Sequence, residues 1–408
     1  MAIDTLFDFR SLKTTPFGGD LAMKKNLRNL IWFFLLMVGG QVHAQDLMKD
    51  SLFVQRAMRG VDAAYDMRFS EADRIFSEIE RQHPQHPVGP FLKALSRWWL
   101  ILASVGDTAI DDVFHNEMTQ VSQRCDRMLA KNPNSYDAVL FKGMAVGFRS
   151  RLYANRSEWI RSFKYGKEAV DYVTKAAQIA PENNDYYFGW GVYDYFADVL
   201  PRKYPAMKYA MWFLPRGSRE RGLEEIKRTF KHGTFMRSEA AYYLFQINYI
   251  YEPRYEGASF YIGWLRTKYP NNSFYHILQA RVENYFGYSE RAKQLFHEVA
   301  SRHEKRQSGY TAAIAEQAYY YLSGLYLFKG DYEEAKGVAV KLLGLDTKGK
   351  KKSDFHVLGR LRLGMTYDAL GERNKAKEMY NLVLRLPDTQ KAHDRAKEFL
   401  KNPYQGIR

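Results

Sequence analysis

Three short stretches of the sequence hold residue types that could do chemistry. Cys125 is the only cysteine and a potential nucleophile. His83 and His86, in RQHPQHP, could ligate a metal, and the run KGKKK at 348–352 could hold a phosphate. The neighbouring sequence supplies neither a base for the thiol nor further metal ligands. We therefore expect an inert buried thiol and an interhelical turn. For the lysine run, a solvated loop is the simpler interpretation and a phosphate-binding patch is the alternative.

Common catalytic signatures are missing from the sequence. No GxSxG, HExxH, CxxC or phosphate-loop run occurs, so the usual marks of hydrolases, zinc sites and nucleotide binding are absent. We expect recognition without catalysis, and no metal or cofactor. An enzyme, or a subunit of an enzyme that acts on a wall or lipid component, is a second hypothesis. Titratable groups that converge in a closed cleft would favour it.

The composition is that of a globular protein with a basic surface. Of 408 residues, 46% are hydrophobic and 26% charged, and the net charge is +15. This length allows two or three domains or one repeat array. The charge favours an anionic partner, such as a lipid surface or an acidic protein, while a solvated surface without a specific partner is the alternative. One cysteine allows no internal disulfide.

The segment 23–45, MKKNLRNLIWFFLLMVGGQVHAQ, has the layout of a secretory signal peptide. Lys24, Lys25 and Arg28 precede an apolar run, and small residues follow before Gln45. The run is shorter than the roughly 20 residues of a spanning helix, so an uncleaved anchor is the weaker alternative. We expect an upstream extension at 1–22, a signal peptide at 23–44, and export to the periplasm or cell envelope of a Gram-negative bacterium. An exported protein is not expected to bind nucleic acid.

The sequence near the C-terminus, VLGRLRLGMTYDALGERNKAKEMYNLVLRLPD, carries a regular pattern of small and large residues. Counted from Val357 as position 1, Gly364 falls at 8, Gly371 at 15, Ala376 at 20 and Tyr380 at 24. This pattern resembles the tetratricopeptide repeat, a helix-turn-helix unit of about 34 residues. In such a unit, small residues let two helices approach closely while large ones fill the space between neighbouring units.

The same register recurs along most of the chain. Regular units are expected near 53–84, 239–270, 273–304, 316–347 and 357–388. Irregular units with insertions are expected in 87–234, a polar capping helix at 389–401 and a tail at 402–408. The resemblance implies an all-α, right-handed superhelix of about eight helical hairpins plus a C-terminal capping helix over 45–401. A weaker likeness, carried by an aromatic insert before the G-x-x-x-x-G-L run at 217–223, is to envelope repeat proteins of Bacteroidota and Chlorobiota.

The resemblance also implies where a partner would bind. First helices of such repeats line a concave groove, and position 13, which faces it, is aromatic in six registers here. The expected groove residues are Tyr65, Phe148, Tyr195, Phe196, Tyr251, Arg281, Tyr285, Phe328 and Arg362. The rings offer apolar contact area, and the arginines could hold a carboxylate. We therefore expect a scaffold that binds a protein or peptide. The alternative is that insertions shift the registers and the rings form core between repeats.

One aromatic and basic insert has no place in the repeat. It spans 201–216, PRKYPAMKYAMWFLPR, and its candidate surface residues are Lys203, Tyr204, Lys208, Tyr209, Trp212 and Phe213. Tyrosine, tryptophan and cations together suit the boundary between lipid and water, so the insert could lie on an anionic membrane. Alternatively, it folds back as a plug over the groove or the adjacent helices.

Overall fold

The computed structural model describes residues 46–104, 107–204, 208, 216–345 and 352–406. The predicted upstream extension and signal peptide lie outside these residues. The chain divides into two units, Met1–Lys49 and Asp50–Arg408. The described part of the first unit contains a short 3-10 helix, η1 (Leu47–Lys49). The longer helices belong to the second unit, and the described secondary structure is helical throughout.

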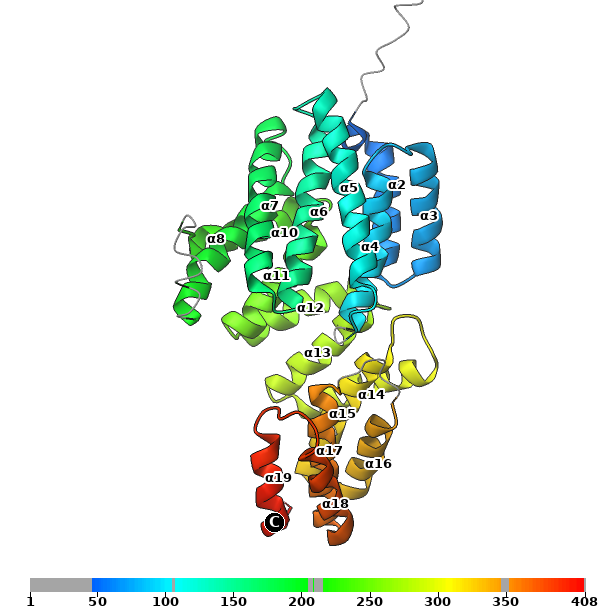
Figure 1. Cartoon of the computed structure of the whole chain (residues 1–408), viewed down its shortest axis with the longest axis vertical. Coiled ribbons are helices and arrows are strands. Elements are labelled where there is room, and N and C mark those ends of the chain that lie inside the picture. Colours follow the sequence, from blue (N-terminus) through cyan, green and yellow to red (C-terminus); the bar gives the residue numbers. More distant parts are fainter. Residues whose placement is uncertain (1–45, 105–106, 205–207, 209–215, 346–351, 407–408) are drawn as a thin grey trace, which may run out of the picture. The chain divides into compact units, whose positions relative to one another are not determined.

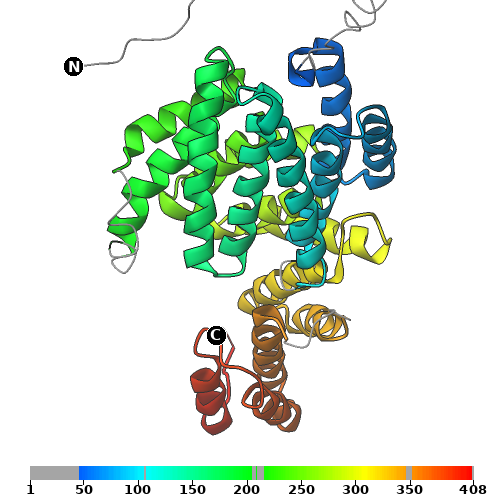
Figure 2. The ribbon, with the colours of Figure 1, turned by 45° about the horizontal axis from the view of Figure 1, so that its top comes forward.

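The unit Asp50–Arg408 is a succession of helical hairpins, and consecutive hairpins are neighbours in both ribbon views (Figures 1 and 2). The pairs are α2 (Ser51–Tyr65) and α3 (Phe69–Gln82), α4 (Val88–Ala103) and α5 (Asp111–Lys131), α6 (Tyr136–Asn155) and α7 (Trp159–Ile179), α8 (Tyr186–Lys203) and α10 (Arg219–His232), α11 (Arg237–Gln246) and α12 (Tyr255–Lys268), α13 (Ser273–Tyr285) and α14 (Ser289–Glu304), α15 (Ala312–Lys329) and α16 (Tyr332–Leu343), and α17 (Asp354–Ala369) and α18 (Arg373–Val383). Helix α19 (Ala392–Lys401) follows and packs on α17 and α18. These elements confirm the expected fold of eight hairpins and a capping helix over the described residues.

The repeat pattern produces this packing through contacts between large and small residues. In the last hairpin, a Cβ atom added to Gly364 would lie 2.5 Å from Cε1 of Tyr380, so only glycine lets α17 and α18 come this close. Ala376 is fully buried beside them. The turn passes through Gly371 at φ 78°, a left-handed conformation that favours glycine. Small and large residues at these spacings therefore form one closely packed pair of helices.

The middle of the chain keeps hairpin geometry despite its insertion. Helices α8 and α10 cross at Gly191 and Gly222, and a Cβ on Gly191 would lie 2.8 Å from the Gly222 carbonyl oxygen. The buried Asp185 carboxylate, just before α8, accepts hydrogen bonds from the backbone N–H groups of Thr234 and Met236 at 2.8 and 3.0 Å. Helices α8 and α10 therefore stay packed as one hairpin, which is tied together where α8 begins and α10 ends.

One irregular element lies between the helices of the fifth hairpin. Helix α11 continues directly into a π-helical turn, η2 (Ile247–Tyr251), which the repeat pattern does not predict. The backbone N–H of Glu252 closes the turn on the Ile247 carbonyl at 2.8 Å. Within the described part of the chain, the helices are too short or too polar to cross a membrane.

Candidate functional site

The reactive residues that the sequence singles out have structural surroundings. Cys125 is buried, and burial raises the pKa of its thiol to about 12, which keeps it protonated and unreactive. His86 accepts the Val88 N–H on Nδ1 at 3.2 Å, so its Nε2–H donates to the buried Asp137 carboxylate at 3.0 Å. Among the described residues no group of His, Cys, Asp and Glu could hold a metal ion. Of the KGKKK run, only the exposed Lys352 is described.

Three of the predicted groove residues are core residues. Tyr65, Phe148 and Tyr195 are 3%, 6% and 0% exposed, so none can touch a partner in this structure. The physical reason is that the first helices of separate hairpins pack against one another. The ring of Trp99 on α4 lies 4.7 Å from that of Tyr65 on α2 and 5.2 Å from that of Tyr275 on α13. At these positions the prediction needs correcting, because the protein's own rings fill the space.

A buried ion pair lies among these rings. Glu239, on α11, accepts a hydrogen bond from the Tyr65 hydroxyl at 2.6 Å and one from Arg151 at 2.7 Å. The Arg151 guanidinium also lies over the rings of Trp98 and Tyr243, with its carbon 4.8 and 5.5 Å from the ring centres. The pair joins α2, α6 and α11, which are far apart in sequence. It holds the N-terminal hairpins closed instead of presenting a charge to a partner.

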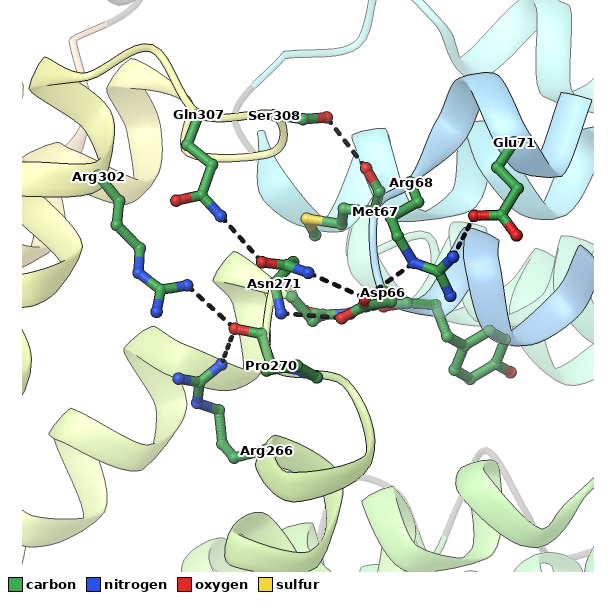
Figure 3. A network of polar contacts seen from close by, with 12 residues as sticks. Asp66, Met67, Arg68, Glu71, Arg266, Pro270, Asn271, Arg302, Gln307 and Ser308 are labelled. Carbon is green, nitrogen blue, oxygen red and sulfur yellow. Dashed lines mark hydrogen bonds and ion pairs between the residues drawn. The ribbon is translucent and has the colours of Figure 1, made fainter. Parts of the chain in front are cut away.

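The turn between α2 and α3 is bound by the two loops that precede the sixth and seventh hairpins. Asp66 accepts hydrogen bonds from the backbone N–H and the side-chain amide of Asn271 at 2.8 and 2.9 Å (Figure 3). The Tyr65 carbonyl accepts one from the Asn272 amide at 2.6 Å, and the Met67 carbonyl accepts one from the Ser308 hydroxyl at 3.0 Å. These bonds span more than 200 positions of sequence. They close the N-terminal part of the repeat onto hairpins six and seven.

A cavity of about 340 Å³ opens beside the junction between the α2–α3 turn and these two loops. Its lining residues are Met67, Arg68, Phe69, Ser70, Glu71, Asn271, Gln307 and Ser308. The Arg68 guanidinium is already paired with the carboxylates of Asp66 and Glu71. Charges of both signs are therefore balanced within the protein, and the cavity offers no free charge to a ligand.

Two further predicted groove residues line the edge of the fourth and fifth hairpins. The rings of Phe196 and Tyr251 lie 5.1 Å apart, and both are partly buried against the core. Lys203 lies over the Tyr251 ring and donates to the Ile250 carbonyl at 2.9 Å. Of the other insert residues, Tyr204 and Lys208 are exposed, while Tyr209, Trp212 and Phe213 lie outside the described residues. Whether the insert covers the fold or contacts a membrane stays a prediction.

The remaining predicted groove residues lie on the C-terminal hairpins. Tyr285 is 58% exposed and Phe328 is 51% exposed, at the C-terminal ends of α13 and α15, which pack against each other. Arg281, one turn before Tyr285, contacts the Gln317 side chain at 3.4 Å, a weak hydrogen bond. We call Arg281, Tyr285, Gln317 and Phe328 the aromatic-basic strip. Sequence reasoning missed Gln317, which lies at position 2 of the predicted unit 316–347.

Arg362 is used inside the protein. Its guanidinium stacks on the Tyr320 ring, with its carbon 3.7 Å from the ring centre, and donates to the Tyr320 carbonyl. Gly324 makes room for it, because a Cβ there would lie 2.7 Å from an Arg362 nitrogen. This arginine joins α17 to α15, so it is not free to hold a carboxylate of a partner.

The accessible charges on α13 and α15 themselves are positive, although Lys329 pairs with the exposed Glu290 of α14 at 3.5 Å. The acidic residues of α13 and α15 are Glu283 and Glu316, and both are buried. Tyr255 donates to Glu283 at 3.1 Å, which occupies part of that carboxylate inside the protein. The charged side chains that α13 and α15 leave accessible are Arg281 and Lys329. The strip therefore combines exposed rings with positive charge.

Comparisons with known proteins agree with the fold. The tetratricopeptide repeat profile matches residues 359–390. The Cut9–Hcn1 hetero-tetramer of the APC/C has a similar chain, with a TM-score of 0.53 and 14% identity over 92% of this chain and 60% of that one. Yeast Tom70 matches with a TM-score of 0.40 and 9% identity, over 93% of this chain and 92% of Tom70. The C-terminal part of a repeat protein from Cytophaga hutchinsonii matches with a TM-score of 0.35 and 14% identity, over 72% of this chain and 96% of that one.

The chain has the all-α fold of tetratricopeptide-repeat proteins, and its last regular unit contains the segment that matches the tetratricopeptide repeat profile. It spans 60% of the length of the Cut9–Hcn1 chain that it matches, and at 14% identity the likeness concerns the fold alone. No curated protein matches the sequence.

Proposed function

We propose that this protein is a non-catalytic scaffold that binds a segment of a partner protein along the aromatic-basic strip. The observation that carries the proposal is the exposure of Tyr285 and Phe328 on neighbouring first helices whose own acidic residues are buried. Large rings in water lose little side-chain entropy on binding and bring much apolar area to an interface. Stacked hairpins of this kind provide extended binding surfaces.

The chemistry of the strip favours a partner segment with apolar and acidic side chains. Arg281 has an Nε–H that is buried without an acceptor, and its hydrogen bond to the Gln317 side chain is long. A carboxylate at this position would replace that weak bond with a charge-assisted one. The groove of the N-terminal hairpins is filled by their own rings, so these hairpins leave no room for a partner segment. In the proposal they support the strip.

The proposed location is the cell envelope of a Gram-negative bacterium. Its support is the signal-peptide layout of 23–45, which precedes the described residues. An accessory role beside an envelope enzyme is compatible with the same scaffold. Its partner would then be an enzyme subunit held on the strip.

The experiment is affinity purification from native envelope extract with a matched pair of variants. The double variant Tyr285→Ser with Phe328→Ser removes the two exposed rings of the strip. We expect the proteins that co-purify with the native chain to be lost, as identified by mass spectrometry. The helical circular dichroism signal should not change, because exposed side chains contribute little to packing.

The control is Phe260→Ser, which removes an equally exposed ring, 58% accessible, from α12 outside the strip. It should retain the same co-purifying proteins. Retention by the double variant, or equal loss in both variants, would show that the strip is not the binding surface.

A further inference from the structure

Two arginines converge on one carbonyl oxygen beside the junction of Figure 3. Arg266 on α12 and Arg302 on α14 each donate to the Pro270 carbonyl, at 2.8 and 3.0 Å. Arg302 also donates to the Tyr310 hydroxyl at 3.0 Å. Within the described ranges, neither guanidinium has a carboxylate at ion-pair distance, although the salt bridges of this protein are numerous. The two guanidinium groups therefore donate to uncharged oxygens, the Pro270 carbonyl and the Tyr310 hydroxyl, and not to carboxylates.

Buried donors without acceptors lie in the same cluster. The Nδ1 atom of His276 faces the Tyr310 hydroxyl at 3.0 Å. Because that hydroxyl oxygen already accepts from Arg302, its hydrogen points to Nδ1, and the other nitrogen of His276, Nε2, carries the proton. This Nε2–H is buried and has only a long contact, 3.5 Å, with the Glu298 carboxylate, and the Nε–H of Arg266 is buried without an acceptor. Unpaired buried donors cost free energy that an oxyanion would recover.

The electrostatic environment of the cluster is positive. Burial, and then the charges of Arg266 and Arg302, lower the pKa of His276 to about 2. Burial lowers the pKa of Arg266, and the charge of Arg302 lowers it further. The carboxylate of Glu298 is 43% exposed, and its oxygen lies 3.5 Å from Nε2 of His276. This one carboxylate at the rim does not balance two guanidinium groups, so a net positive charge remains.

We propose that Arg266 and Arg302 form a binding site for a phosphate dianion. Both hydrogen bonds to Pro270 lie at the surface and both arginines are partly exposed, so a small anion can reach the two guanidinium groups. Two guanidinium forks offer more N–H donors than the two oxygens of a carboxylate can accept, and they match the several oxygens of a tetrahedral anion. Pro270 precedes Asn271, which binds Asp66, so a bound phosphate also strengthens the closure of the N-terminal hairpins.

The test is isothermal titration calorimetry on the full chain at constant ionic strength and neutral pH. The titrants are inorganic phosphate, sulfate, acetate and glycerol phosphate. We expect phosphate and sulfate to bind and acetate to bind about tenfold more weakly. Tighter binding of glycerol phosphate than of inorganic phosphate would assign the source as a phosphate carried by an organic group, and the reverse order would assign free phosphate. No binding of either phosphate overturns the proposal.

Three variants separate the site from the general basic charge of the protein. Arg266→Gln should weaken phosphate binding about tenfold, whereas Lys305→Gln, an exposed cation next to the site, should leave it unchanged. Equal effects of the two variants overturn the proposal. If Arg266→Gln fails to fold, Glu298→Gln decides the question. Removing this rim carboxylate should tighten phosphate binding about threefold, and unchanged binding overturns the proposal.

Discussion

The buried pair of Arg151 and Glu239 allows a sharp test of how the N-terminal hairpins stay closed. Glu239 is 3% exposed and joins α11 to Tyr65 on α2 and to Arg151 on α6. The substitution Glu239→Gln keeps the size and one acceptor oxygen but removes the charge. Arg151 then keeps a positive charge inside the protein without its counter-charge.

The magnitude follows from the surroundings of the guanidinium. Breaking a buried pair by removing one partner costs about 3–5 kcal/mol. Arg151 lies over the rings of Trp98, Phe148 and Tyr243, and the variant keeps these contacts, so the unpaired guanidinium retains some electrostatic stabilisation. Its side chain also keeps 19% exposure to water. We therefore expect Glu239→Gln to lower the free energy of unfolding by about 3 kcal/mol, the lower end of the range.

The assay is urea unfolding followed by tryptophan fluorescence. Trp98 contacts the Arg151 guanidinium and Trp99 contacts Tyr65, so both rings report on this region. A double-mutant cycle with Arg151→Met isolates the pair. Because the double variant buries no charge at either position, it should be more stable than the sum of the single changes predicts, by about 2 kcal/mol.

The control is an exposed pair, Arg161 and Glu158, whose side chains are 64% and 41% exposed. Glu158→Gln should change the free energy of unfolding by no more than about 0.5 kcal/mol. A cost below about 1 kcal/mol for Glu239→Gln, or additivity in the cycle, would refute the view that this pair holds the hairpins closed.

Two other predictions concern pH and helix packing. Burial, with nearby arginine charge, lowers the pKa of His276 to about 2 and that of His356 to about 4, whereas both protonate near 6.5 when unfolded. Since the folded pKa values are depressed, stability is present above about pH 6.5 and falls on acidification, by about 2 kcal/mol per histidine at about pH 5. Replacing both by Gln should flatten the pH dependence in urea melts, and an unchanged slope would contradict the assignment. Gly60→Ala should lower the free energy of unfolding by about 1–3 kcal/mol, because the added methyl group would overlap the Phe76 ring. Gly337→Ala, with open space around it, should be neutral or stabilising. Equal urea midpoints for the two variants would exclude close packing at Gly60.

The sequence by itself determined the helical hairpins, because their packing is local. Gly364 meets Tyr380 only 16 positions along the chain, and a fixed spacing of small and large residues encodes that contact directly. The same holds for Gly60 and Phe76 in the first hairpin. Where an insertion separates two helices, as between α8 and α10, the G-x-x-x-x-G-L run at 217–223 still marks one of the two crossing glycines, Gly222. It does not mark the π-helical turn η2.

The tertiary structure alone decided which groove positions are exposed. Tyr65, Tyr285 and Phe328 occupy the same repeat position, yet Tyr65 is buried and the other two are exposed. Tyr65 is buried because Glu239, 174 positions away, accepts its hydroxyl hydrogen and the ring of Trp99 packs against it. Repeat position sets the direction of a side chain relative to its own hairpin. Burial depends on whether a distant hairpin returns to cover it, and no spacing within one repeat encodes that contact.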